Sequence, residues 1–418
     1  MKNKKNETPD WKVLHKKFKA YTTGHPRLLE VSAEVKRAIK RRDEGIVMVT
    51  GPTRAGKTTL LMGVINSILL ENLPEMEKDP GFLPAAWMEA YAYKRGYKWR
   101  DHWYGCLEAL NEPLIKYKSA GYNILSDRNA SHAPTNHRYE KEDILRRSFE
   151  NTTDRKRTSV FGVDEAQSIV VGSSRDNHRA NVEVIKSVAQ NSGALHILCG
   201  NYDVLELFNL SGQIGARTGR PIHFSRYRTD CEKDLVWFAA VVADFTSKMP
   251  VPEPPNFEKI LEYLIDRSLG LVGLLKIWFS DALGDALEDG RPTVMPDDLE
   301  KHEPPEEVLD RISKEIILGE RRLEQNGSKF ALIKARMYAG TKFDEEEWKK
   351  KQSSISKDAS GSGAEAETPA ATPEGSGELG DAVPAKNRAS KRPRRNSRPF
   401  ERAPVRDKVG HGRKKKVA

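Results

Sequence analysis

Cysteine is scarce in this chain. Its three cysteines, Cys106, Cys199 and Cys231, lie far apart and show no metal-ligand spacing. An odd and scattered set argues against a disulfide framework and against a zinc centre. We therefore expect a reduced, cytoplasmic protein.

Long hydrophobic runs are also lacking. The longest apolar stretch, 235–245, is interrupted by Asp244. It is far shorter than the roughly 20 residues that a membrane-spanning helix needs. The N-terminus does not have the pattern of a secretory signal peptide. We expect no membrane partner.

Apolar residues are few overall, at 38% of 418 residues, while 31% are charged. This balance predicts that part of the chain does not fold. From residue 353 on, Ser, Gly, Ala, Pro and Glu dominate, and we expect a disordered tail over 353–418. The tail is acidic over 358–385, with six acidic and no basic residues, and basic over 386–418, with fourteen Lys or Arg and two acidic residues.

The basic part of the tail suits nonspecific phosphate binding, although a solubilising tail or a nuclear-import signal has the same composition. The acidic part could fold back and mask it. The whole chain carries a net charge of +10, so the tail accounts for most of the strong basicity.

What the chain does contain is one sharp motif, G-x-x-x-x-G-K-[ST]. It consists of Gly51, Pro52, Thr53, Arg54, Ala55, Gly56, Lys57 and Thr58. In such a loop the backbone N–H groups cradle phosphates, the lysine reaches the β- and γ-phosphates, and the hydroxyl binds Mg²⁺. A buried strand over 45–50 precedes it, and an apolar helix from Thr59 to residue 70 follows, so the helix dipole faces the phosphates. The motif predicts an ATP and Mg²⁺ site that includes Thr59.

Apolar segments elsewhere alternate between strand and helix patterns. Expected strands cover 45–50, 85–90, 158–163, 195–200 and 221–224, and expected helices between them cover 101–118, 141–151 and 181–191, with a helix over 27–42 before the first strand. This alternation predicts an α/β fold with a parallel sheet covered on both faces. After Tyr227 only helices are expected, over 231–248, 257–268, 272–287 and 306–351.

We therefore expect five segments. They are a basic lead-in (1–22), an α/β nucleotide-binding domain (23–228), a helical lid (229–300), a charged helical extension (301–352) and the disordered tail (353–418).

Acidic residues follow the third expected strand. Asp164 would complete the Mg²⁺ shell, and Glu165 would polarise the attacking water. We expect their strand to lie beside the P-loop strand. An acidic strand end followed by a helix N-cap, with no catalytic role, would have the same sequence pattern. Asn201, after the fourth strand, could orient the water or touch the γ-phosphate, or could simply form a turn.

Three arginines flank the fifth expected strand. Arg217 and Arg220 precede it, and Arg226 follows it. An arginine in this region of an oligomeric ATPase reaches the neighbouring subunit's nucleotide, a role that its fixed charge and planar donor group suit. Arg217 is our first choice, and surface arginines in a loop are the alternative for each.

Taken together, these motifs resemble an AAA+ ATPase: the P-loop, Asp-Glu-Ala-Gln at 164–167, Gly-Asn at 200–201, and a helical lid. Within that superfamily the chain resembles the TnsC/TniB group of transposition regulators and, more distantly, MuB. The segment 23–26, which includes His25 and Pro26, resembles the group's linker over the adenine. The segment 270–278 resembles its lid helix, but Lys276 stands nearest to the usual sensor 2 arginine.

The resemblance implies an ATP-dependent oligomer, a ring or helical filament on double-stranded DNA in the bacterial nucleoid. Such proteins mark the target and recruit or activate a DDE transposase, and a target-selector protein is a further implied partner.

Cations and aromatic residues are mixed over 91–104. Lys94, Arg95, Lys98 and Arg100 could contact DNA phosphates while the aromatic rings pack or stack. Alternatively, the rings fill the core and the cations are merely solvated.

Two other functions share these motifs. A replication initiator or helicase loader also has an AAA+ core, but it should carry a winged helix, for which the charged sequence beyond residue 306 leaves no room. A signalling ATPase or secretion helper would not bind DNA, and the basic tail argues only weakly against it.

Overall fold

The computed structural model describes residues 10–41, 45–93, 96–115, 137–170, 175–210 and 220–328, with four isolated residues beyond them. The chain divides into two units, Met1–Thr341 and Lys342–Ala418, and the elements below belong to the first. The expected tail, Lys94, Arg95 and Arg217 lie outside the described residues.

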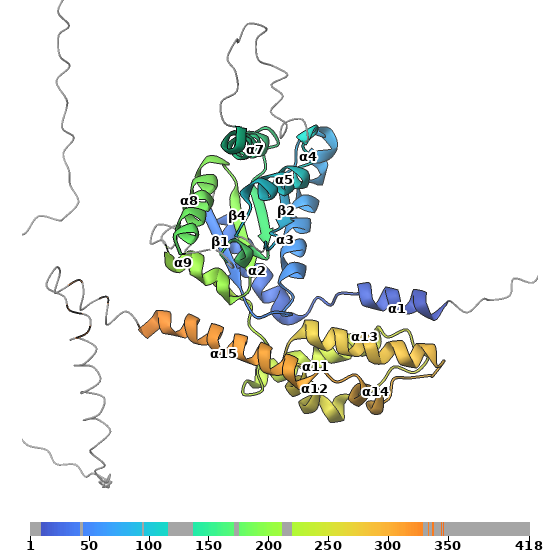
Figure 1. Cartoon of the computed structure of the whole chain (residues 1–418). Helices are drawn as coiled ribbons and strands as arrows, with labels where there is room; N and C mark the ends of the chain where they lie inside the picture. Colours follow the sequence, from blue (N-terminus) through green and yellow to red (C-terminus); the bar gives the residue numbers. More distant parts are fainter. Residues whose placement is uncertain are drawn as a thin grey trace, which may run out of the picture. The chain divides into compact units, whose positions relative to one another are not determined.

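A five-stranded sheet forms the centre of the first unit (Figure 1). Its strand order is β2-β3-β4-β1-β5, and every pairing is parallel. The strands are β1 (Gly45–Thr50), β2 (Ala85–Glu89), β3 (Val160–Asp164), β4 (Leu195–Gly200) and β5 (Ile222–His223). Because all strands run the same way, their carboxyl ends meet at one edge, and this edge carries the motifs.

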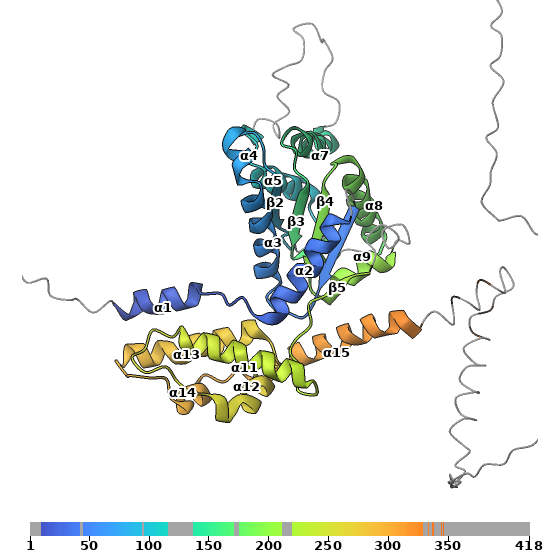
Figure 2. The ribbon, with the colours of Figure 1, turned by 180° about the vertical axis from the view of Figure 1, so that it is seen from behind.

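Helices cover both faces of the sheet, as the two views show (Figure 1, Figure 2). Ile46 and Met48 of β1 pack in one hydrophobic cluster, while Val47 and Val49 pack in another on the opposite face. The first cluster includes α5 (Trp99–Ala109), α7 (His137–Arg155), α8 (Arg175–Asn191) and α9 (Leu205–Leu210). The second includes α2 (Pro26–Lys40) and α3 (Lys57–Glu71), which α4 (Leu73–Lys78) follows. The strands are almost continuously apolar because both of their faces are buried.

A helical part follows the sheet. It contains α11 (Glu232–Ser247), α12 (Leu261–Arg267), α13 (Val272–Glu288), α14 (Pro296–Lys301) and a short 3₁₀ helix at Glu258–Ile260. Two further short 3₁₀ helices belong to the α/β core, Ala166–Ile169 after β3 and Tyr202–Val204 after β4. Helix α1 (Trp11–Ala20), in the segment expected to be a lead-in, packs on α13 and adds Phe18 to the helical core. The long helix α15 (Glu306–Ser328) comes last.

The predicted fold class is confirmed: a parallel α/β nucleotide-binding core is followed by a helical part. One expectation is wrong. Strand β3, which carries Asp164, does not lie beside the P-loop strand, because β4 stands between them. The helix expected over 101–118 ends at Ala109, and the helix expected over 306–351 is described to Ser328. Among the described helices none is long and apolar enough to cross a membrane.

Candidate nucleotide-binding site

The loop between β1 and α3 contains the P-loop motif. Gly56 precedes α3 with φ 104° and ψ 23°, a left-handed conformation that glycine adopts without strain. The helix therefore begins directly at Lys57, and Thr58 and Thr59 lie in its first turn. This geometry directs the unpaired N–H groups of a helix N-terminus towards the loop, as anion binding requires.

Lys57 is buried against its own loop. Its Nζ donates to the carbonyl oxygens of Gly51 at 3.0 Å and Pro52 at 2.8 Å. Burial lowers the pKa of Lys57, and the nearby carboxylates of Glu165, Glu315 and Asp164 act in the opposite direction. A lysine held in this way is available to phosphate oxygens and needs little ordering to reach them.

Thr58, in the first turn of α3, meets Asp164 at the end of β3. The Thr58 hydroxyl donates to Asp164 Oδ2 at 2.6 Å. Burial raises the pKa of Asp164, and the hydrogen bonds from Thr58 and from the Glu165 backbone N–H oppose this rise. A hydroxyl beside a carboxylate fits Mg²⁺, which takes a few hard oxygen ligands from protein and the rest from water and phosphate. Within the described residues no group of three or more His, Cys, Asp or Glu could hold a metal.

Glu165 is linked to the next strand through Gln167. Glu165 has φ 50° and ψ 35°, and its carboxylate accepts a hydrogen bond from Gln167 Nε2. Gln167 Oε1 in turn accepts from the Asn201 N–H at 3.1 Å. The strained backbone of Glu165 and this bridge fix the candidate base relative to the end of β4. The sequence alone indicates no role for Gln167, although this residue belongs to the Asp-Glu-Ala-Gln motif.

Asn201 also forms a turn. Its side-chain oxygen accepts from the Asp203 N–H at 3.0 Å and so caps the short helix Tyr202–Val204. Its carbonyl oxygen accepts from the Thr50 hydroxyl at 3.1 Å, which joins the ends of β4 and β1. The turn-forming role is therefore observed, and the position still borders the site.

A cavity of about 420 Å³ opens where these residues meet. Its lining residues are Thr53, Arg54, Gly56, Lys57, Thr58, Glu165, Gln167, Asn201 and Gly273. The cavity thus brings together phosphate-binding N–H groups, a lysine, a hydroxyl and a carboxylate. Such a set can bind a phosphate chain with Mg²⁺ and activate water beside it.

The helical part closes on this cavity through the start of α13. The Gly273 N–H donates to the Arg54 carbonyl oxygen at 3.0 Å. Lys276, one turn further on, lies elsewhere: its Nζ donates to the Phe18 carbonyl oxygen at 2.5 Å and stands 3.4 Å from the centroid of the Phe18 ring. Burial lowers the pKa of Lys276 to about 8. This lysine holds α1 and is not among the residues that line the cavity.

His25 and Pro26 begin α2. The His25 ring accepts from the Leu28 N–H at 3.3 Å, pairs with the Tyr227 hydroxyl at 2.8 Å and stacks on Phe224 with centroids 6.1 Å apart. The Phe224 N–H donates to Thr50 O at 2.7 Å, which connects the linker to the end of the P-loop strand. Their contact with adenine stays a prediction, since neither residue lines the cavity.

The candidate finger arginines differ in their surroundings. Arg220 is exposed, whereas Nε of Arg226 lies 3.4 Å from Glu320 of α15. Arg226 is therefore engaged within its own chain, which favours Arg217 or Arg220 for a contact with a neighbour.

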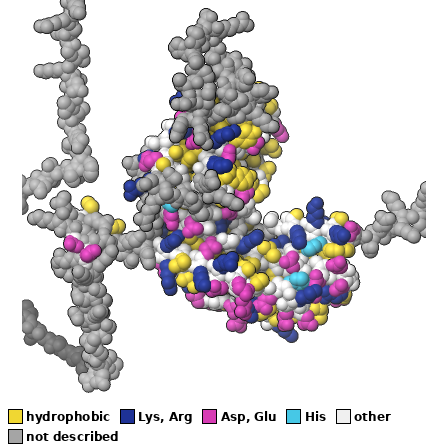
Figure 3. Space-filling view, in the orientation of Figure 1, with side chains coloured by type: hydrophobic (Ala, Val, Ile, Leu, Met, Phe, Trp, Pro, Cys, Tyr) yellow, Lys and Arg dark blue, Asp and Glu magenta, His cyan; other side chains and the backbone are white. Residues whose placement is uncertain are grey.

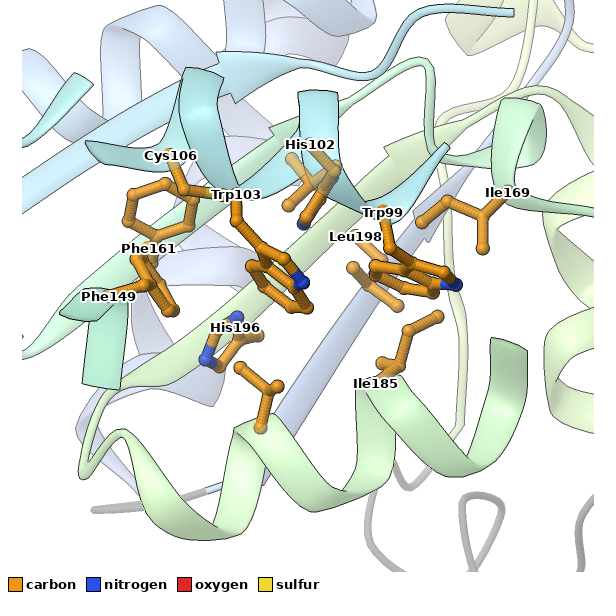
Figure 4. A pocket seen from close by; sticks show the side chains of 12 residues that line it. Trp99, His102, Trp103, Cys106, Phe149, Phe161, Ile169, Ile185, His196 and Leu198 are labelled. Atoms are coloured by element: carbon orange, nitrogen blue, oxygen red, sulfur yellow. The ribbon is translucent and has the colours of Figure 1, made fainter. Parts of the chain in front are cut away.

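Some aromatic residues of the 91–104 segment pack in the core, whereas Tyr91 is 60% exposed. Trp99, His102 and Trp103 are buried and, with Phe149 and His196, surround a cavity of about 20 Å³ behind the sheet (Figure 4). Lys98 and Arg100 are exposed, and Lys98 Nζ stands 4.8 Å from the centroid of the Tyr93 ring. The buried rings therefore fill the core, as the alternative interpretation of this segment predicts. Lys98 and Arg100 are accessible to a ligand.

No single basic patch dominates the visible surface. On the face in Figure 3, Lys and Arg side chains alternate with Asp and Glu side chains over the described residues.

The fold and the site define a P-loop nucleotide-binding protein. Residues 40–208 match the family model described as an AAA domain. No curated protein matches the chain.

Several solved structures are similar in fold. The ORC2 protein of Aeropyrum pernix, in ADPNP–ADP complexes, is 13% identical with a TM-score of 0.45, covering 68% of this chain and 70% of that one. A Drosophila ORC structure bound to DNA is 13% identical with a TM-score of 0.42, covering 72% and 69%. A Walker-type ATPase of Pyrococcus abyssi is 14% identical with a TM-score of 0.37, covering 78% and 88%.

Proposed function

We propose that this protein is an ATP-dependent, DNA-binding AAA+ regulator of DNA transposition. It assembles on target duplex DNA as a ring or helical filament and recruits or activates a DDE transposase, in concert with a target-selector protein. The observation that carries the nucleotide part is the meeting of Lys57, Thr58, Asp164, Glu165 and Asn201 around one cavity.

Each of these residues has a defined task in the proposal. The loop N–H groups and Lys57 would bind the phosphates. Thr58 and Asp164 would hold Mg²⁺, which would supply positive charge to the phosphate oxygens. Glu165 takes a proton from the attacking water, and Gln167 keeps the Glu165 carboxylate in place through the bond between them.

The proposal of an oligomer rests on the source of a further cation for the site. Lys276, the lid cation nearest to the sensor 2 position, is engaged with Phe18. The described lining contains Arg54 and Lys57 as its cations, both from the P-loop. A neighbour's Arg217 or Arg220 would add the charge that stabilises the transition state, so ATP would favour subunit contact and hydrolysis would loosen it.

Paired variants test the nucleotide site. We expect Lys57→Ala to weaken ATP binding by about a hundredfold, because a buried charge-assisted contact is lost. We expect Glu165→Gln to retain ATP affinity but to slow hydrolysis by about a hundredfold or more, because the base is lost and the shape is kept. Titration with a fluorescent ATP analogue and a phosphate-release assay measure the two effects. Unchanged hydrolysis in Glu165→Gln would remove Glu165 from the mechanism.

Assays of DNA binding and strand transfer distinguish the proposed function from its alternatives. A signalling or secretion ATPase would show no ATP-dependent affinity for plain duplex DNA. A replication initiator or helicase loader would bind DNA but would not stimulate a transposase. A strand-transfer assay with a DDE transposase and target DNA, run with and without this protein, distinguishes these two.

A further inference from the structure

Helix α15 places a carboxylate on the P-loop. Glu315 Oε1 accepts hydrogen bonds from both the Thr53 N–H and the Thr53 hydroxyl, each at 3.0 Å. Thr53 lines the nucleotide cavity. Its N–H is one of the loop donors that a P-loop presents to phosphate. A carboxylate of the chain itself therefore occupies a donor of the candidate phosphate site.

The position of Glu315 is determined by the docking of α15. Ile316 is 3% exposed and belongs to the core cluster that contains Val47 and Val49 of β1. Gly319 lies against the ring of Tyr202, so closely that an added Cβ would stand 2.1 Å from two ring atoms. The docked helix thus needs glycine at this position.

Two ion pairs continue the same contact. Glu320 pairs with Arg226 at 3.4 Å, and Arg322 pairs with Asp203 at 3.3 Å. Tyr202 and Asp203 directly follow Asn201, which lines the cavity. Helix α15 therefore contacts both the P-loop and the loop after β4, the two segments that border the phosphate end of the site.

We propose that Glu315 is a specificity-determining residue that competes with the terminal phosphate of ATP for Thr53, so that a docked α15 favours ADP over ATP. The proposal rests on the proposed nucleotide site. Two negative groups repel each other at one donor, and the added phosphate of ATP brings charge that ADP lacks. By linkage, ATP loosens α15 to the same extent that docked α15 weakens ATP.

Affinity measurements on the full chain test this competition. Glu315→Gln keeps an oxygen that can accept from Thr53 but removes the charge. We expect it to tighten binding of a non-hydrolysable ATP analogue by about tenfold while ADP binding changes by less than about threefold. Gly319→Leu displaces α15 from Tyr202 without altering Thr53 or Glu315, and the same selective gain is expected. Glu307→Gln, an exposed carboxylate on the first turn of α15, is the matched control and should change neither affinity.

Hydrogen exchange provides a readout that does not depend on activity. In the unaltered protein the ATP analogue should speed exchange in α15 relative to ADP, and Glu315→Gln should reduce this difference. A ratio of ATP to ADP affinity that is equal in the unaltered protein and both variants would overturn the proposal while leaving the nucleotide site intact. Failure of the unaltered protein to bind either nucleotide would overturn the site and the competition together.

Discussion

Gln167 joins the two strand ends on which the candidate site depends. Its amide donates to Glu165 at the end of β3 and accepts from the Asn201 N–H at the end of β4. A single side chain therefore couples the candidate base to the loop that borders the phosphate end. The same loop is where Tyr202 and Asp203 meet α15.

Replacing Gln167 by alanine should slow ATP hydrolysis without weakening nucleotide binding. We expect Gln167→Ala to slow ATP hydrolysis by about tenfold to a hundredfold, because Glu165 loses the partner that orients it. The ADP dissociation constant should stay within about threefold. Single-turnover hydrolysis and ADP titration measure the two, with Asn191→Ala, an exposed amide at the end of α8, as the control. A parallel loss of affinity and rate would mean that Gln167 only supports the local structure.

Buried histidines make the core sensitive to acid. Burial lowers the pKa of His102 to about 3, with a smaller effect from His196, and lowers the pKa of His196 to about 4. An unfolded histidine titrates near 6.5. Between pH 6.5 and 4 the unfolded chain therefore binds more protons than the folded chain, and the free energy of unfolding falls as the pH falls.

Removing one of these histidines should flatten that dependence. Between pH 7 and pH 5 the unaltered protein should lose about 2 kcal/mol more of its unfolding free energy than His102→Gln, the contribution expected from one histidine that stays neutral when folded. Glutamine can still accept the hydrogen bond between the Tyr97 hydroxyl and His102, whose atoms lie 2.6 Å apart. Urea unfolding at the two pH values measures the difference. Identical losses in both proteins would show that His102 can be protonated in the folded core.

At the scale of elements, α1 packs on α13, a contact that the sequence alone does not predict. Lys276 Nζ lies 3.4 Å from the Phe18 ring centroid, 5.0 Å from that of Phe245 and 5.5 Å from that of Tyr21. His15 Nε2 also pairs with the Ser280 carbonyl oxygen at 2.8 Å. The lysine thus fixes α1 on the helical part.

Loss of the Lys276 side-chain amine should loosen the packing of α1 without changing ATP affinity. Lys276→Met keeps a long apolar side chain but loses the hydrogen bond and the cation–π contact, each worth about 1 kcal/mol. We expect faster hydrogen exchange in Trp11–Ala20 and an ATP affinity within about twofold of the unaltered protein. Lys248→Met, an exposed lysine at the end of α11, is the control. A tenfold loss of ATP affinity in Lys276→Met alone would restore the sensor 2 role.

The sequence predicts some of these elements well for a physical reason. The P-loop, its strand and its helix are consecutive, so the motif, its apolar strand and its apolar helix can be read together. The alternation of strands and helices also suffices for the fold class.

Other features depend on contacts between distant segments, which a single sequence does not show. This applies to the strand order β3-β4-β1 and to the bridge through Gln167. It also applies to the burial of Trp99 and Trp103 and to the contact of Glu315 with Thr53. The basic and aromatic pattern around Trp99 was ambiguous because buried rings and stacking rings have the same composition.

At the scale of the whole molecule, we propose that a nucleotide site controls assembly on DNA. The AAA domain covers 40–208, and the contacts of α13 and α15 with the P-loop come from outside it. The segments C-terminal to the domain therefore contact the loop that we propose binds the nucleotide. The strongly basic stretch over 386–418 would strengthen binding to phosphates wherever the assembly forms.

Electron microscopy of the full chain with duplex DNA tests this central claim most directly. We expect rings or filaments on DNA with ATP or a non-hydrolysable analogue and few with ADP, because the γ-phosphate completes the contact between subunits. Glu165→Gln should give longer-lived assemblies with ATP, and Lys57→Ala should give none. Equal assemblies with ATP, with ADP and in Lys57→Ala would contradict the account, because assembly would then not depend on the nucleotide.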